Sequence, residues 1–120
     1  MYSGVPNLVS CFGYINASWT LKADLTSEYV CRLIKHMKKN DFEVVCPQFE
    51  VDIEESDVFL NGFSSGYIKR AANAQPKQGK EKPWINLQDY FKDWVDIKFK
   101  KLDDGYLRFS KLEKLFIILF

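Results

Sequence analysis

The chain has 120 residues and a mass of 14.1 kDa, which is enough for one domain or for part of one. Its 17 Lys and Arg nearly balance its 16 Asp and Glu, and the formal net charge of +1 excludes a globally basic nucleic-acid binder and an acidic solvating tail. A hydrophobic content of 47%, with 16% aromatic residues, excludes a disordered chain and demands a substantial core or a large buried interface.

A strand followed by a long helix is predicted for the first third of the chain. Residues 7–14 are apolar and partly β-branched or aromatic, which is typical of a buried strand. From Trp19 to Met37 apolar residues recur every four positions, which predicts one amphipathic helix that ends near Asn40.

The start of this helix is the one place where local structure predicts chemistry. The unpaired backbone N–H groups of a first helical turn favour an anion, such as a phosphate, a carboxylate or the electron-rich pyrimidine edge of a reduced flavin. Ordinary capping of the helix by Asn16 or Ser18 is the plainer interpretation, and a break near Asp24 is also open.

The middle of the chain predicts short strands and an acidic surface. Residues 42–47 form a short strand that Pro47 ends, and residues 48–54 alternate like a half-buried or edge strand. The acidic side chains of 50–57 are expected to line a solvated strand face. A divalent-metal site is the alternative, but the ligand spacing of an EF-hand loop is absent.

The next segment predicts a short helix, a basic loop and a second helix. Residues 64–74 form a capped helix that Pro76 stops, and residues 77–83 form a loop. A second helix opens at Trp84, with a proline near its first turn. Five cationic residues between 69 and 82 make nucleic-acid binding an alternative to a solvated loop or a patch for a phosphate-bearing cofactor. The near-zero net charge argues against a nucleic-acid partner.

The last part of the chain predicts a turn, a strand and an apolar tail. Residues 103–105 form the turn and 106–109 the strand. The tail, 115–120, consists of six apolar residues and is too short to span a bilayer. It can pack, dock on a partner or promote aggregation.

The sequence lacks the usual signals for export, metal binding and self-contained nucleotide chemistry. No apolar run approaches the ~20 residues of a membrane span, and we expect no secretory leader. Three widely spaced cysteines and a single histidine match no zinc pattern, so we predict free thiols in a reducing cytoplasm and no metal site. A catalytic pair of a cysteine with His36 is an alternative, although its lysine-rich surroundings favour a solvated helix end.

The six glycines never fall two positions apart, so no G-x-G-x-x-G turn exists. The sequence also has no Walker motif, no G-x-S-x-G and no H-E-x-x-H. These absences argue against an enzyme that binds and uses a nucleotide on its own.

Two blocks of sequence resemble one family. Residues 4–25, GVPNLVSCFGYINASWTLKADL, are similar to the late FAD-domain segment of bacterial flavin-dependent monooxygenases. These are flavin-containing and Baeyer–Villiger-like enzymes that use FAD and NADPH. A second block resembles the C-terminal end of the same proteins and comprises SGYIKR at 65–70, PKQG at 76–79, Pro83, Trp84 and Tyr90. The blocks occur in the right order and cover roughly 2–109.

The resemblance implies an α/β fold, or α+β for the isolated piece. The chain would be the C-terminal fragment of a flavoprotein with two dinucleotide-binding domains. Residues 1–46 would close the FAD-binding domain as a strand–helix unit, and 47–120 would form a C-terminal cap segment with short strands, two helices and the tail. The residues nearest the flavin would bind it through backbone N–H groups and positioning, with no catalytic residue identified: Asn16, Ser18, Trp19 and Thr20.

The implied activity is that of an oxidoreductase that inserts one oxygen atom from O₂ into a small organic substrate, with FAD and NADPH as cofactors. Because both glycine-rich motifs of the family are absent, we predict that the chain is inactive alone and that a separately encoded N-terminal half is its partner. Asp89 also stands where the family often has Asn. A non-catalytic remnant or interaction module of a split or decayed flavoprotein gene is the first alternative, and an unrelated small α+β binding protein is the second.

Overall fold

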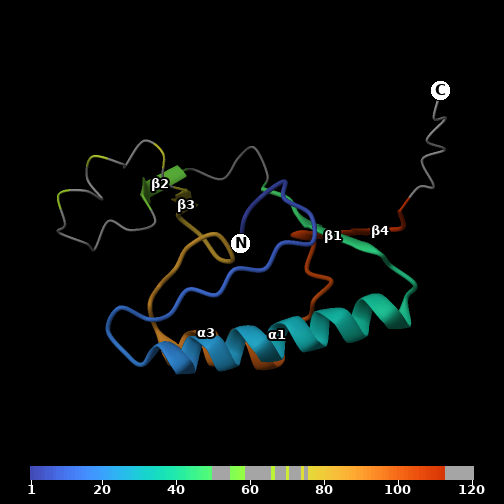
Figure 1. The fold of residues 1–120 in the computed structure, drawn as a ribbon, viewed down its shortest axis with the longest axis horizontal. Coiled ribbons are helices and arrows are strands. Elements are labelled where there is room, and N and C mark those ends of the chain that lie inside the picture. Colours follow the sequence, from blue (N-terminus) through green and yellow to red (C-terminus); the bar gives the residue numbers. More distant parts are fainter. Residues whose placement is uncertain (50–54, 59–65, 67–69, 71–73, 75, 113–120) are drawn as a thin grey trace. The chain divides into compact units, whose positions relative to one another are not determined.

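The computed structural model describes residues 1–49, 55–58, 66, 70, 74 and 76–112. The elements are α1 (Trp19–Lys39), β1 (Val44–Pro47), β2 (Glu55–Val58), β3 (Lys77–Gly79), α3 (Tyr90–Phe99) and β4 (Leu107–Ser110) (Figure 1). Helices combined with antiparallel strand pairs give an α+β architecture, which agrees with the fold class expected for the isolated piece. The described residues form two compact units, one from 2–48 and 88–112 and the other from Met1 and 49–87.

The core of the larger unit lies where the β1–β4 pair covers the C-terminal half of α1 (Figure 1). The two strands are antiparallel, with Val45 opposite Phe109. Leu33 of α1, Val45 of β1 and Leu107 of β4 are buried together, because the apolar stripe of the helix meets the inward face of the strand pair. Partly buried side chains pack around these three: Tyr29, Met37, Leu102 and Phe109.

Helix α1 is confirmed as one uninterrupted helix, without a break near Asp24. It ends at Asn40, as the sequence predicts, and there the backbone N–H of Asn40 donates to the carbonyl of His36. Basic residues in the last turn oppose the negative end of the helix dipole: His36, Lys38 and Lys39.

The strand predicted over residues 7–14 is absent. Asn7 adopts a positive φ of 54°, and its side-chain oxygen accepts a hydrogen bond from the N–H of Val45 at 2.9 Å. Beyond it the segment leaves β1, and Leu8 and Val9 are 53% and 52% exposed. The prediction was wrong because such an apolar strand needs sheet neighbours on both sides, which the described residues do not provide.

The second predicted helix begins later than expected, at Tyr90 instead of Trp84. Gln88 has a positive φ of 53°, which interrupts a helical path from Trp84. Asp89 is the true N-cap, and its carboxylate accepts a hydrogen bond from the N–H of Lys92 at 3.2 Å. The backbone conformation of Gln88 therefore delays the start of α3, although Pro83 favoured a helix that begins at Trp84.

The short strands agree with the sequence in part. Pro47 ends β1 as predicted, and β4 begins at Leu107, one residue after the start of the predicted strand 106–109. The predicted loop 77–83 is wrong at its beginning, because Lys77–Gly79 forms β3. Pairing with β2 explains the error, because the backbone of this polar segment pairs with a strand that lies more than fifteen residues earlier in the chain.

The smaller unit is organised around Trp84. This side chain is buried, and its ring meets that of Phe49 edge to face with centroids 5.2 Å apart. The N–H of Gly79 donates to the carbonyl of Trp84 at 3.1 Å, and the N–H of Asn86 donates to the side-chain oxygen of Gln78 at 3.1 Å. In this unit β2 and β3 pair antiparallel with an irregular register.

Several predictions fall partly or wholly on residues that are not described. Residues 48 and 49 are not in a strand, but the rest of the predicted strand 48–54 lies outside the described part of the chain. So do most of the acidic segment 50–57, most of the predicted helix 64–74 and the whole tail 115–120. Among the described residues, no helix is long and apolar enough to cross a bilayer.

Candidate functional site

The first turn of α1 has no side-chain cap. Ser18 occupies the N-cap position with extended backbone, but its side chain makes no capping hydrogen bond. Its Oγ instead lies 2.8 Å from the hydroxyl oxygen of Thr20. The prediction that Asn16 or Ser18 caps the helix with its side chain is therefore wrong. The N–H of Leu21 donates to the carbonyl of Ser18 at 3.3 Å, which leaves the N–H groups of Trp19 and Thr20 for an acceptor.

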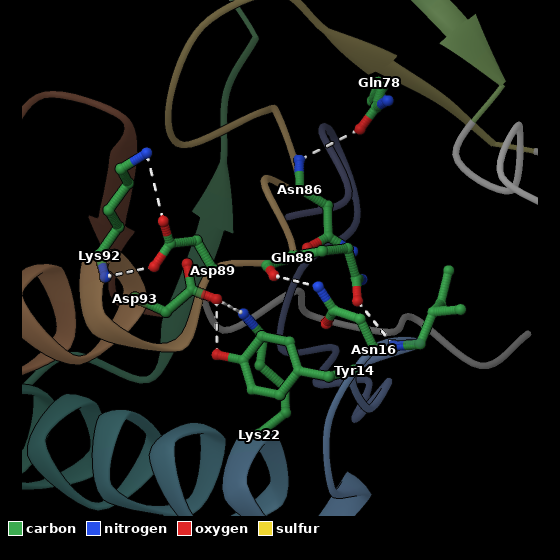
Figure 2. A network of polar contacts seen from close by, with 10 residues as sticks. Tyr14, Asn16, Lys22, Gln78, Asn86, Gln88, Asp89, Lys92 and Asp93 are labelled. Atoms are coloured by element: carbon green, nitrogen blue, oxygen red, sulfur yellow. Dashed lines mark hydrogen bonds and ion pairs between the residues drawn. The ribbon is translucent and has the colours of Figure 1, made fainter.

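No acidic residue lies in the first turn of α1. The side chain of Asn16 donates to the carbonyl of Gln88 at 3.2 Å, and the N–H of Ile15 donates to the side-chain oxygen of Gln88 at 2.7 Å (Figure 2). The loop before α1 thus bonds to the segment before α3 and does not cap α1. The first turn of α1 therefore suits a bound anion.

An aromatic surface borders the uncapped turn. Trp19 is 55% exposed, and its indole lies directly against Gly13. A Cβ atom added to Gly13 would lie 2.2 Å from Cδ2 of Trp19, so any larger residue displaces the ring. The ring of Phe12 packs on the same indole with centroids 5.5 Å apart. A flat π-surface is thereby held next to the free N–H groups.

A partly buried polar cluster next to the turn joins Tyr14, Lys22 and Asp93 (Figure 2). Tyr14 is 2% exposed, and its hydroxyl donates to Oδ2 of Asp93 at 2.7 Å. The ammonium of Lys22 lies 2.5 Å from the same carboxylate oxygen and 5.1 Å from the centroid of the Tyr14 ring. These contacts bind the segment before α1, the second turn of α1 and helix α3 to one another.

The cluster keeps Tyr14 protonated. Burial raises the pKa of its hydroxyl well above the ordinary value, and the hydrogen bond to the Asp93 carboxylate with the negative charge of that group raises the pKa further. A phenol that stays neutral at physiological pH can only donate to Asp93. Tyr14 therefore has a positioning role, since its hydroxyl is committed to the carboxylate and its ring is covered.

The four predicted flavin-contacting residues lie together at the exposed start of α1. Asn16 orients the loop, Ser18 and Thr20 place their hydroxyls side by side, and Trp19 presents its indole. None of these four side chains is an acid or a base.

Sequence reasoning missed the residues that support this turn, namely Gly13, Tyr14, Lys22 and Asp93. Asp93 follows Lys22 by 71 residues, so no local pattern connects the two. A glycine directly before an aromatic residue and close to a tryptophan was the one local signal for close packing.

The described residues offer little support for the other sites considered. No group of three or more His, Cys, Asp or Glu residues among them could hold a metal ion. His36 packs its ring against Phe109, with centroids 5.0 Å apart, in the last turn of α1. All three cysteines are free thiols, as predicted.

Comparison with known proteins identifies relatives. The chain is 48% identical over 111 residues to a protein named "Probable FAD-binding monooxygenase AlmA" from Acinetobacter sp, which covers 92% of this chain and 22% of the relative. It is 46% identical over 111 residues to the FAD-containing monooxygenase EthA of Mycolicibacterium smegmatis, with the same coverage of each chain. It is 47% identical over 112 residues to EthA of Mycobacterium tuberculosis H37Rv, again 22% of that protein.

These similarities confirm the resemblance read from the two sequence blocks. The matches extend over nearly the whole chain, but the chain spans only about a fifth of the length of the curated relatives. No protein-family model matches it, and no solved structure is similar to it. The relationship therefore rests on sequence similarity to part of a larger protein.

Proposed function

Because the chain is related over most of its length to one part of the FAD-containing monooxygenases, we propose that it forms part of the flavin site of such an enzyme. The observation that carries the proposal is the uncapped, acid-free first turn of α1, which lies next to an exposed indole. An isoalloxazine ring is flat and bears an electron-rich pyrimidine edge, so it needs a π-surface and N–H donors side by side.

Each residue of the turn would have a different role in flavin binding. The N–H groups of Trp19 and Thr20 would donate to the pyrimidine edge, and the indole of Trp19 would cover part of the ring. The positive end of α1 stabilises negative charge there, which favours the reduced anionic form of a flavin. Asn16 and Ser18 hold the approach to the turn. When bound, FAD supplies the redox chemistry, which these side chains cannot perform.

The complete enzyme is proposed to use FAD and NADPH and to insert one oxygen atom from O₂ into a small organic substrate. In this assignment residues 1–46 close the FAD-binding domain and 47–120 form a C-terminal cap on the substrate side. The pyrophosphate and ribose of FAD need a glycine-rich turn that this sequence does not contain, so they would bind to a part of the flavoprotein that this chain does not span. A cytoplasmic location accords with three free thiols.

A chimera tests the proposal. The matching segment of EthA or AlmA is replaced by this chain, and the purified protein is desalted and measured for retained FAD and for NADPH-dependent O₂ uptake. We expect retained FAD in the chimera, and none after desalting when the isolated chain is mixed with FAD. A chimera that folds but does not retain FAD would favour a non-catalytic remnant.

A matched pair of variants links FAD binding to the turn. Thr20→Glu places a negative charge in the uncapped turn, whereas Ser27→Glu adds the same charge two turns later on an exposed position of α1. We expect the first variant to weaken FAD binding by the chimera about tenfold or more, and the second to leave it nearly unchanged. Equal effects of the two substitutions would remove the turn from the flavin site.

A further inference from the structure

Helix α3 contacts α1 through polar groups. Asp93 of α3 bonds to Lys22 and Tyr14, and Lys98 of α3 lies 2.6 Å from the carboxylate of Glu28. The guanidinium of Arg32 donates to the carbonyl of Lys100, just after α3, at 2.8 Å. No residue of α3 is fully buried. A helix that meets its neighbour in this way uses little of its apolar surface for the core.

The apolar residues of α3 are instead exposed. Phe91 is 77% exposed, Val95 49% and Phe99 71%. Their spacing of four residues places them on one side of the helix, and we call these three residues the α3 stripe. Two phenylalanines left this far in water, on a helix that buries acidic groups against its neighbour, mark a surface that is covered in the functional protein.

The two phenylalanines of the α3 stripe contact other aromatic rings of the same helix. Phe91 meets Tyr90 edge to face with centroids 5.7 Å apart, and Phe99 meets Trp94 in the same manner at 5.7 Å. Ion pairs flank the stripe, with Lys92 bound to Asp89 at 3.2 Å. Aromatic side chains surrounded by a polar rim are the usual composition of a specific protein interface.

We propose that the α3 stripe docks on the part of the flavoprotein that this chain does not span, which rests on the proposed function above. The relatives are more than four times as long as the matched segment, so over three quarters of each lies outside it and is available to cover the stripe. The stripe also continues the candidate site, because Asp93 on the same helix positions Tyr14 and Lys22 beneath the uncapped turn. Docking through α3 would hold the flavin-contacting turn in place from the opposite side.

The experiment is site-specific photo-crosslinking in the chimera described above. A benzoylphenylalanine is placed at position 91, and the control places it at position 34, where Ile34 is an exposed apolar residue of α1 that is 46% exposed. After irradiation, cross-linked peptides are identified by mass spectrometry. We expect position 91 to cross-link to residues of the host enzyme outside the replaced segment, at least tenfold more often than position 34 does.

Three results would overturn the proposal. Cross-links from position 91 to residues 49–87 or to 113–120 would show that this chain covers its own stripe. Cross-links between two copies of the chimera would identify a homodimer interface. Failure of position 91 to exceed position 34 would show that nothing covers the stripe.

Thermal unfolding is a second test, which applies even if the photo-reactive residue disturbs the fold. The double substitution Phe91→Gln with Phe99→Gln should lower the unfolding midpoint of the chimera by about 3 °C or more, and Ile34→Gln should lower it less. The same double substitution should lower the unfolding midpoint of the isolated chain much less, because there it removes only the ring contacts of Phe91 with Tyr90 and of Phe99 with Trp94. An equal loss in the isolated chain and in the chimera would contradict the proposal.

Failure of this proposal can be told from failure of the proposed function. FAD retention by the unsubstituted chimera reports on the flavin site alone. A chimera that retains FAD but shows no host cross-link rejects the interface and keeps the flavin site. Host cross-links without retained FAD keep the interface and reject the flavin site.

Discussion

The two ends of helix α1 are built in opposite ways. At its C-terminal end the N–H and the side chain of Asn40 both donate to the carbonyl of His36, at 3.2 and 2.8 Å, and the N–H of Phe42 donates to the carbonyl of Met37 at 2.9 Å. At its N-terminal end the side chain of Ser18 caps nothing. One end has its backbone groups paired and its charge balanced, while the other keeps donors and positive potential for a ligand.

The difference between the two ends shows which contacts stabilise each part of α1. The C-terminal half of α1 packs Leu33 on Val45 and Leu107, and it folds as a local core. The N-terminal turn is held by distant polar contacts to α3, through Asp93. A binding site needs unpaired groups, so its order must come from supports placed behind it.

The largest effect is expected from breaking the stable end. Leu33→Ala should lower the free energy of unfolding by about 3 kcal/mol, since it removes a buried side chain from the centre of the α1–β1–β4 core. Chemical denaturation followed by circular dichroism measures the loss. Ile34→Ala is the matched control. Ile34 is the exposed neighbour of Leu33, so its truncation should lower the free energy of unfolding by well under half as much. Similar losses for the two variants would show that the core lies elsewhere.

The next effect concerns the packing of the open end. Gly13→Ala should lower the free energy of unfolding by about 1–3 kcal/mol and shift the tryptophan emission, because the new methyl group collides with the indole of Trp19. Trp19→Ala in the same chain should abolish most of the penalty, so a double-mutant cycle gives the coupling directly. Additive penalties for the two substitutions would contradict the contact.

Removal of the Tyr14 hydroxyl tests the support behind the turn. Tyr14→Phe should cost about 1 kcal/mol at neutral pH, since Asp93 loses a hydrogen-bond donor. The folded state raises the pKa of Tyr14, and burial raises the pKa of Tyr29 to about 12, both from an ordinary value of 10.0. Because both raised pKa values favour the protonated folded state, their contribution is complete below pH 10 and is lost as the pH rises toward 12 and above.

The wild-type chain should therefore lose stability above pH 10 more steeply than Tyr14→Phe, which retains only the Tyr29 contribution. Urea unfolding between pH 8 and about 11.5, with tyrosinate absorbance as a second reading, measures the difference. Parallel curves for the two proteins would mean that Tyr14 ionises as freely in the folded chain as in the unfolded one.

The smallest effect on stability is expected from adding a cap to the N-terminal end of α1. Ser18→Asp supplies the missing cap and a negative charge, so it should stabilise the isolated chain by about 0.5–1 kcal/mol. The same change should weaken FAD binding in the chimera, because the new carboxylate occupies the donors. Ser18→Ala, which removes a side chain that caps nothing, should leave the stability nearly unchanged. Stronger FAD binding by Ser18→Asp would contradict the proposed site.

Sequence reasoning succeeded where structure is local. The spacing of apolar residues predicted α1, Asn40 predicted its end, and Pro47 predicted the end of β1, because periodicity and backbone restrictions act within a few residues. It failed where distant segments decide. Residues 7–14 form no strand, and Lys77–Gly79 became one only by pairing with β2.

The candidate site shows the same division. The sequence alone determined that a helix begins after Ser18 and that its first turn lies in a segment shared with flavin-dependent monooxygenases. The tertiary structure decided which residues support this turn, because Gln88 engages the loop before it and Asp93 engages Tyr14 and Lys22 from another helix. Such contacts join residues some seventy positions apart, and their partners are chosen by packing, which a local pattern does not encode.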